Sequence, residues 1–290
     1  MHIRSYRSIV NTLVPVVSLG ILLMPVFATA QGQNKNDEAD EEQALSVDEI
    51  VKKANYVAYY QGKDGRARVQ MTIADKQGRT RKRELTILRR DQAPEDAADE
   101  AFTGDQKLYA YFHRPPDVNG TVFMVWKHLK GDDDRWLYLP ALDLVRRIAA
   151  SDKRTSFVGS HFFYEDVSGR TIRADTHELV ETTDSFYVLK NTPRKPDLVE
   201  FDYYKMWIHK KTFIPVKSSY FKKDREYRTY EVLEVAPVDG YQTVTKSKMT
   251  DRDMGGHTVL EYTNVKYNIG LPEQVFTERY LRRPPRKYLR

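Results

Sequence analysis

Histidine and carboxylate side chains are the residues of this sequence that could bind a metal ion or transfer protons. The histidines beyond His2 are scattered, and no two of them have the H-x-x-x-H spacing that places both imidazoles on one face of a helix. The most compact group is His161 with Glu165 and Asp166. We interpret this group as structural and expect no bound metal.

The remaining polar motifs do not favour catalysis. Gly159-Ser160-His161 differs from the G-x-S-x-G nucleophile motif, and Asp132-Asp133-Asp134 lacks the ligand spacing of a calcium loop and is typical of a hairpin turn. The sequence has no phosphate loop and no dinucleotide fingerprint. The absence of cysteine excludes disulfides, thiol nucleophiles, Cys-zinc sites and iron–sulfur clusters. Paired glycosidase carboxylates stay an open alternative that no motif favours. We therefore expect a binding protein without a cofactor rather than an enzyme.

Alternating apolar and polar residues dominate the sequence beyond residue 65. In 66–75, Ala67, Val69, Met71 and Ile73 alternate with polar side chains, as in a strand with one buried face. No βαβ rhythm appears, which favours an antiparallel, mainly β (α+β) fold of about 11–12 strands. The stretch 150–180 is less regular and is expected to hold a short helix or a lid. The predicted strands are 66–75, 79–90, 107–113, 121–128, 135–139, 144–149, 185–190, 199–209, 212–221, 227–236, 242–251 and 258–268.

One amphipathic helix is predicted before the strands. Ser46 and Glu49 have the spacing of a capping box, which marks a helix start. A single apolar stripe then runs for about four turns, so the helix must lie on an apolar surface. The stripe consists of Val47, Ile50, Val51, Ala54, Val57 and Ala58.

The predicted sheet has more apolar surface than one helix can cover. It must curl toward a barrel or leave an apolar trough, with a pocket of roughly several hundred Å³. An elongated apolar ligand such as an acyl chain or a sterol-like lipid would fit there. Ordinary core packing is the alternative for each aromatic residue. The candidate cavity-lining residues are Phe123, Val125, Trp136, Tyr138, Tyr203 and Trp207.

Both ends of the sequence differ in composition from the strands. Residues 1–30 have a basic start, an apolar stretch and Ala28-Thr29-Ala30, typical of a signal peptide cleaved after Ala30. An uncleaved membrane anchor is the alternative. Without cysteine the exported protein is not lipidated, and we expect it in the periplasm, where nucleic acid is not a partner. We further expect a disordered acidic linker at 31–45, one domain at 46–280 and a basic tail at 281–290 that is either solvated or bound to anionic lipid or an acidic protein.

The segments 136–142, 145–148, 156–160 and 163–166 together resemble the signature of LolA-like outer-membrane lipoprotein-sorting proteins. The resemblance extends from about 45 to 279. It implies an unclosed, strongly curved antiparallel β-barrel around an N-terminal helix and a short lid, with an apolar cavity for lipid or acylated protein. Similar proteins accompany membrane transporters of the resistance-nodulation-division class, which implies such a transporter at the inner membrane as a partner. His161 differs from the acidic residue that similar sequences carry after the serine.

Charged residues within this signature predict a salt bridge. A carboxylate of Glu165 or Asp166 near Arg146, Arg147 or Arg154 would pin the loop that follows the strands. Gating of a lid by that salt bridge is the alternative role.

The leading functional hypothesis is a monomeric periplasmic carrier or chaperone. It would bind a lipid or a lipid-modified protein by shielding its apolar surface and would pass it between membrane partners. The alternative is an envelope-stress sensing and regulatory module of similar fold. A neighbouring transporter gene would discriminate between the two.

Overall fold

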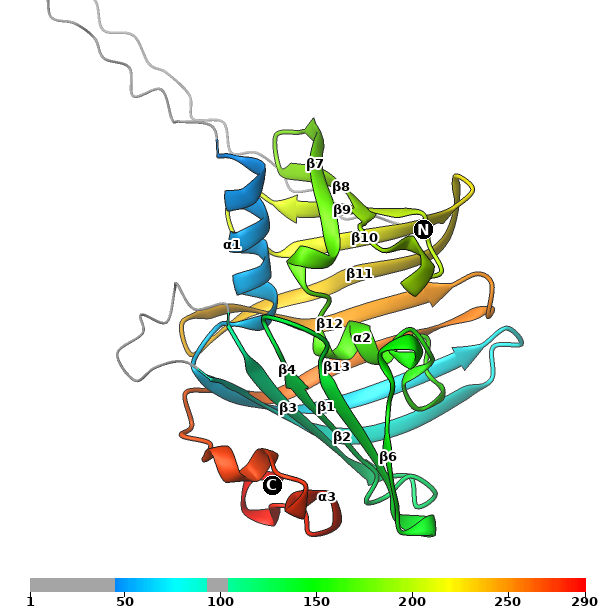
Figure 1. The fold of residues 1–290 in the computed structure, drawn as a ribbon, viewed down its shortest axis with the longest axis vertical. Helices are drawn as coiled ribbons and strands as arrows, with labels where there is room; N and C mark the ends of the chain where they lie inside the picture. The colour runs from blue at the N-terminus through cyan, green and yellow to red at the C-terminus, as the bar shows by residue number, and fades with distance from the viewer. Residues whose placement is uncertain (1–44, 93–103) are drawn as a thin grey trace, which may run out of the picture. The chain divides into compact units, whose positions relative to one another are not determined.

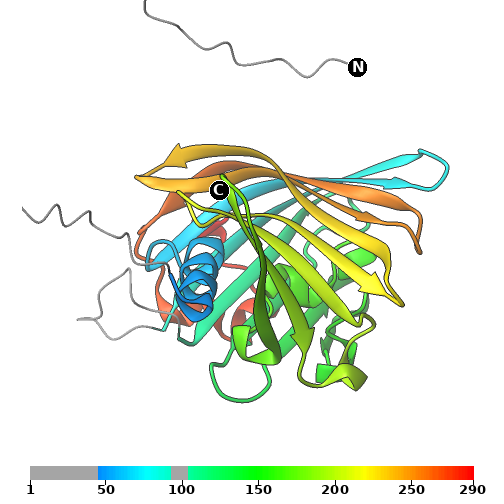
Figure 2. The same cartoon turned by 90° about the horizontal axis from the view of Figure 1, so that it is seen from above.

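The computed structural model describes residues 45–92 and 104–290, and its dominant element is one 13-stranded antiparallel sheet (Figure 1). The sheet is unclosed and curled, as Figure 2 shows from above, so the predicted fold class is confirmed. The predicted signal peptide and most of the acidic linker lie outside the described residues. The strands are β1 (Asp64–Asp75), β2 (Thr80–Asp91), β3 (Gln106–Arg114), β4 (Val122–Lys127), β5 (Asp134–Leu139), β6 (Leu144–Arg147), β7 (Asp175–Thr182), β8 (Phe186–Pro193), β9 (Tyr203–His209), β10 (Pro215–Lys222), β11 (Arg225–Val238), β12 (Tyr241–Asp251) and β13 (Gly256–Tyr267).

Two meanders meet at the centre of the sheet. The strand order β6-β5-β4-β3-β2-β1-β13-β12-β11-β10-β9-β8-β7 makes β1 and β13 neighbours although they are far apart in the sequence. Their register pairs Met71 with Leu260 and Asp75 with Gly256. Gly256 has a φ of +111°, and a Cβ there would lie 2.2 Å from the carbonyl oxygen of Ala74. Only glycine therefore fits at this end of the central pair.

Helix α1 (Val47–Tyr59) forms as the sequence predicts. The Ser46 side chain accepts a hydrogen bond from the Glu49 backbone, and the Glu49 carboxylate accepts one from the Ser46 backbone at 2.8 Å. The helix buries Ile50, Val51 and Ala54 against Leu189 and Ile208 on the concave face of the sheet. Apolar burial thus fixes α1 inside the curl, where the resemblance places its N-terminal helix.

The segment between β6 and β7 also lies on the concave side (Figure 1). It contains α2 (Tyr164–Ser168) and three short 3₁₀ helices at Ala150–Asp152, Phe157–Gly159 and Ile172–Ala174. Phe157, Phe162 and Tyr164 from this segment are buried in the main core with residues of β1 to β5. The irregular stretch predicted here is thus a packed wall of the interior.

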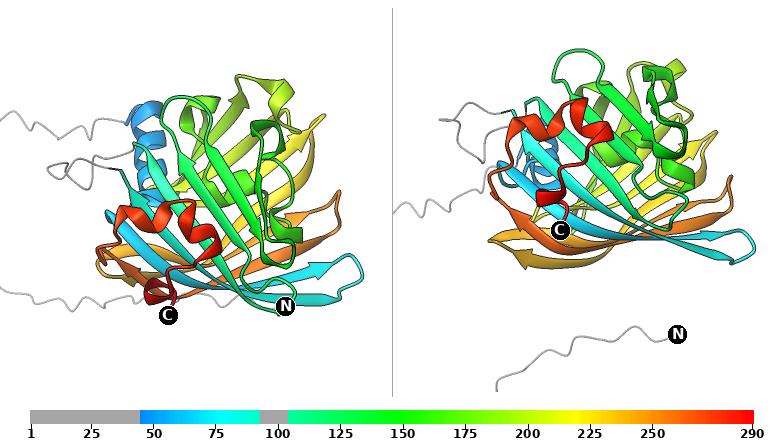
Figure 3. Two further views of the ribbon diagram at one scale, coloured as in Figure 1. Left: turned by 60° about the horizontal axis from the view of Figure 1, so that its bottom comes forward. Right: turned by 90° about the horizontal axis from the view of Figure 1, so that it is seen from below.

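The C-terminal residues cover the opposite, convex face of β2 to β5 (Figure 3). Helix α3 (Arg279–Arg282) and the following turn bury Leu281 and Leu289 against Leu88 and Trp136. The segment 281–290, expected to be a basic tail, therefore packs on the sheet. The reason is that its basic residues are interspersed with apolar ones, which the net charge does not reveal.

Leu281→Ala is expected to lower the free energy of unfolding by about 2–3 kcal/mol, because Leu281 is only 1% exposed and its loss leaves a cavity. Ligand binding on the concave side should be unchanged. Urea denaturation of the variant measures the first effect. A variant as stable as the wild type would show that this segment is not docked.

Candidate functional site

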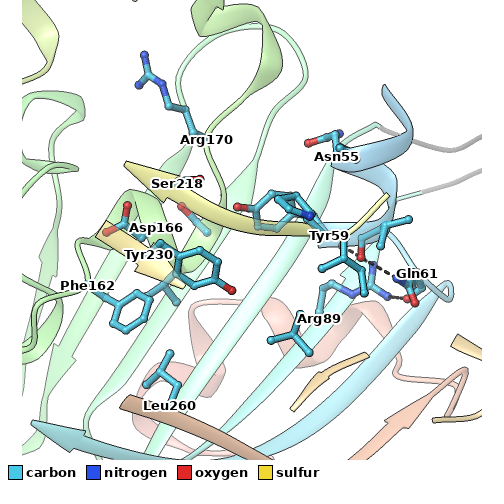
Figure 4. Close-up of a pocket in the computed structure, with 18 of the residues that line it drawn as sticks. Asn55, Tyr59, Gln61, Arg89, Phe162, Asp166, Arg170, Ser218, Tyr230 and Leu260 are labelled. Atoms are coloured by element: carbon cyan, nitrogen blue, oxygen red, sulfur yellow. Dashed lines mark hydrogen bonds between the residues drawn. The ribbon is translucent and has the colours of Figure 1, made fainter. Parts of the chain in front are cut away.

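A cavity of about 390 Å³ lies between α1, the concave face of the sheet and the α2 segment (Figure 4). Its size falls in the lower part of the range of about 300–1,000 Å³ that is usual for small-molecule sites. Apolar side chains form most of its wall. They include Val51 and Ala54 of α1 together with Val69, Met71, Leu85, Leu108, Phe157, Phe162, Met206, Ile208, Met249 and Leu260.

Tyrosine side chains add polar atoms to this apolar wall. Tyr59 comes from α1, Tyr220 from β10 and Tyr230 from β11, and all three line the cavity. Burial raises the pKa of Tyr220 and Tyr230 to about 12. Burial raises the pKa of Tyr59 as well, and the neighbouring Tyr220 adds to that effect. These phenols therefore stay neutral and can donate hydrogen bonds over the whole physiological pH range.

A buried ion-pair network closes one side of the cavity. Asp166 accepts hydrogen bonds from Arg228 and, at 3.3 Å, from Arg154. Burial alone would raise the pKa of Asp166, but the two guanidinium groups outweigh it and hold the pKa below its ordinary value. Glu165 lies 3.1 Å from Arg170, which also binds Asp175 at 2.7 Å. The network thus ties α2 to β7 and β11.

A tight turn carries the segment into this position. Phe157 donates a backbone hydrogen bond to Phe162 at 2.7 Å, and the Ser156 hydroxyl donates to the Ser160 carbonyl at 2.6 Å. Val158 has a φ of +48°, which a β-branched residue rarely adopts. The His161 backbone N–H donates to the Thr258 hydroxyl at 3.0 Å, and the His161 carbonyl accepts from Arg228 at 2.7 Å. His161 therefore anchors the turn to β13 and β11.

Comparison with known proteins gives two kinds of match. A family model described as "-like: Uncharacterized protein" matches residues 104–283. Among solved structures, a DUF1329 family protein from Desulfovibrio piger is 28% identical, with a TM-score of 0.70 over 80% of this chain and 97% of the other. A putative outer membrane lipoprotein-sorting protein domain from Vibrio parahaemolyticus is 26% identical, with a TM-score of 0.70 over 81% and 97%. The chain belongs to the LolA-like family.

A more distant member has the same fold. A LolA superfamily protein from Nitrosomonas europaea is 18% identical, with a TM-score of 0.61 over 82% of this chain and 100% of the other. No curated protein matches the sequence.

The charged residues singled out in the LolA-like signature separate into two places. Glu165 and Asp166 lie in the buried network, whereas Arg146 and Arg147 on edge strand β6 are exposed and bind Asp152 and Asp134. Arg154 alone of the three proposed arginines reaches the two carboxylates. The salt bridge expected with Arg146 or Arg147 is therefore corrected to Arg154, joined by Arg170 and Arg228 from outside the signature.

None of the six aromatic and aliphatic candidates lines the cavity. Phe123 and Val125 point to the concave face of the sheet, but they are fully buried beneath Phe157 and Tyr164. Trp136 and Tyr138 lie on the convex face, under the C-terminal segment. On β9, Tyr204, Met206 and Ile208 face the cavity. Tyr203 and Trp207 alternate with them and therefore point to the other, convex face of the sheet.

A charged residue on β9 could have shown which side chains of this strand face the solvent and which face the cavity. Lys205 shares a face with Tyr203 and Trp207, and a lysine marks the solvent side of a strand. On β5 no such signal exists, because both faces are covered by protein. Sequence reasoning also missed the cavity tyrosines Tyr59, Tyr220 and Tyr230.

Two other kinds of site were considered. Across residues 45–92 and 104–290, no group of three or more His, Cys, Asp or Glu side chains is arranged to hold a metal ion. No described helix is long and apolar enough to cross a bilayer. The mainly apolar wall of the cavity with its few polar atoms is suited to bind an amphiphile.

Proposed function

We propose that this protein is a periplasmic carrier that binds a lipid, or the acyl chains of a lipid-modified protein, and passes it between membrane partners. The observation that carries the proposal is the apolar cavity between α1 and the concave face of the sheet. Each methylene group moved from water into such a site contributes about 0.8 kcal/mol. Affinity would therefore follow the length of chain that the cavity accommodates.

Two further observations support this role. The Vibrio parahaemolyticus protein, similar in fold and at 26% identity, is described as a putative outer membrane lipoprotein-sorting domain. The signal-peptide pattern of residues 1–30 supports export to the periplasm. A transporter of the resistance-nodulation-division class at the inner membrane is the partner we propose.

The ion-pair network is proposed to fix one wall of the cavity rather than to act as its gate. Arg228 is completely buried, and Asp166 and Glu165 are nearly so. Separating such a pair costs about 3–5 kcal/mol. Access to the cavity is therefore easier by displacement of another part of its wall than by rupture of this network.

A cavity-filling variant tests the proposal. Met206→Trp adds bulk to a side chain that lines the cavity, so saturable binding of a fluorescent fatty acid is expected to weaken at least tenfold. Lys205→Trp is the matched control on the same strand, because this side chain points to the face of the sheet opposite the cavity. The change should leave binding unchanged. Fluorescence titration measures both variants.

The wild-type protein provides the decisive outcome. Mass spectrometry of organic extracts of protein purified from its native periplasm should find a co-purified lipid. Empty extracts together with no saturable probe binding would contradict the carrier role.

A further inference from the structure

A second cavity, of about 600 Å³, lies on the convex side of the sheet beside the C-terminal segment (Figure 3). Arg66 and Arg68 of β1 line it, because side chains alternate along a strand and Ala67 between them packs into the concave core. Arg66, near the end of the central strand pair, also borders the apolar cavity. Arg286 and Arg290 line the second cavity from the C-terminal segment. Two distant segments thus bring four arginine residues to one cavity.

These arginines have few acidic neighbours. None of the side chains that line the cavity carries a carboxylate. The Glu84 carboxylate lies 3.7 Å from Arg68, and the two side chains are 38% and 36% exposed. The side chains of Arg66, Arg286 and Arg290 form no ion pair or hydrogen bond with any residue in 45–92 or 104–290. Glu84 and the carboxyl group of the last residue can neutralise two guanidinium groups at most, so the cavity keeps a net positive charge.

The guanidinium group of Arg68 is held in place at the floor of this cavity. Its Nη1 lies 3.1 Å from His113 Nε2, 3.3 Å from the Leu289 carbonyl and 3.4 Å from the Thr86 hydroxyl. Burial and the nearby Arg68 lower the pKa of His113 to about 4, so the imidazole is neutral and its Nε2 accepts. Within the described part of the chain, Nε and Nη2 of Arg68 make no hydrogen bond. A donor group that is already oriented loses little entropy when it binds an anion.

Several arginines around one space are suited to bind a phosphate group. A planar guanidinium group donates two parallel hydrogen bonds to two phosphate oxygens, and each of these bonds is strengthened by charge. A phosphate has more acceptor oxygens than a carboxylate and can therefore be shared by several arginines. A lysine ammonium group would supply the charge without this planar geometry.

We propose that the cavity on the convex face binds a phosphate group, either free in solution or as the head group of an anionic lipid, through Arg66, Arg68 and Arg286. Arg68 supplies the fixed donors at the floor, and the two arginines without a protein partner close on the anion from β1 and from the C-terminal segment. The site does not depend on the proposed carrier function, because it takes a different chemical group on the other face of the sheet.

Inorganic pyrophosphate is the probe for a free phosphate. Calorimetric titration of the full chain at low ionic strength should show saturable binding of one pyrophosphate per chain. Arg66→Gln/Arg286→Gln should weaken this binding at least tenfold, because it removes two guanidinium donors from the cavity. Arg81→Gln/Arg279→Gln is the matched control, since it removes the same charge from exposed arginines that do not line the cavity. Melting curves check that both double variants are folded.

Vesicles of mixed phosphatidylglycerol and phosphatidylcholine are the probe for a lipid head group. Flotation of the wild type with these vesicles, retained in Arg81→Gln/Arg279→Gln but lost in Arg66→Gln/Arg286→Gln, would assign the site to a lipid. Specific binding of pyrophosphate without flotation would assign it to a free phosphate. If neither probe distinguishes the cavity variant from its control, the arginines do not form a phosphate site and the proposal is wrong.

Discussion

Asp166→Ala is expected to lower the free energy of unfolding by about 3–5 kcal/mol. The substitution leaves Arg228, which has no exposed side-chain surface, with Asp251 at 3.8 Å as its remaining carboxylate, whereas Arg154 keeps Glu165 and Glu200. It also removes the acceptor for the Phe163 backbone N–H, which lies 2.6 Å from the Asp166 carboxylate. The α2 segment should loosen, so both the melting temperature and the denaturation midpoint should fall.

The matched control is Asp152→Ala. Its carboxylate contacts Arg146 at 3.4 Å, but both side chains are largely exposed, so the change should cost less than about 1 kcal/mol. Equal melting temperatures for the two variants would show that the buried ion pairs of Asp166 stabilise the fold no more than the exposed pair of Asp152.

The same network predicts a dependence of stability on pH. Burial alone would raise the pKa of Asp166 and Glu165, but the neighbouring arginines outweigh it and lower both values. A carboxyl group with a lowered pKa in the folded state stabilises the protein above its ordinary pKa, and this stabilisation is lost as pH falls through the folded-state value. The melting temperature should therefore decrease below about pH 4, and this decrease should be smaller in Asp166→Ala. If the melting temperature of Asp166→Ala fell with pH as steeply as that of the wild type, Asp166 would not be a source of the acid sensitivity.

Ile50→Asp is the second substitution with a large expected effect. Ile50 is 0% exposed and packs against Leu189 and Ile208, where an aspartate would be buried without a partner. Loss of apolar contacts and burial of a charge together should cost about 4–5 kcal/mol. Denaturant unfolding measures the effect directly.

Lys52→Asp serves as the control on the exposed side of the same helix. An aspartate at this exposed position stays in water, and its repulsion from Asp48 should cost less than about 1 kcal/mol. If Ile50→Asp also melted at the wild-type temperature, α1 would be a loosely attached element rather than part of the core.

The local elements of the fold could be predicted because their signals are local. The capping box and apolar stripe define α1, and each of the twelve predicted strands overlaps an observed one. Strand β7 was missed because its outer half is exposed and rich in polar residues, which obscures the alternation of Leu179 with its neighbours. An edge strand needs to bury less apolar surface than a central one, so its sequence carries a weaker pattern.

The site was less predictable because its geometry depends on contacts between distant segments. Alternation defines two faces of a strand but does not say which one is concave when protein covers both, as at Trp136 and Leu137 on β5. Asp166 and Arg228 are 62 residues apart, and nothing near either residue indicates the other. Only the curl of the sheet brings them together.

The pairing of β1 with β13 has a consequence for how the chain folds. The first meander, β1 to β6, can form as soon as its residues are available, but the hydrogen-bonding edge of β1 stays open until Gly256–Tyr267 arrives. Contacts between such distant segments slow folding, and an unpaired strand edge invites intermolecular pairing. The incomplete N-terminal meander is therefore the species most prone to aggregate, and synthesis or translocation that stalls before residue 256 would trap it.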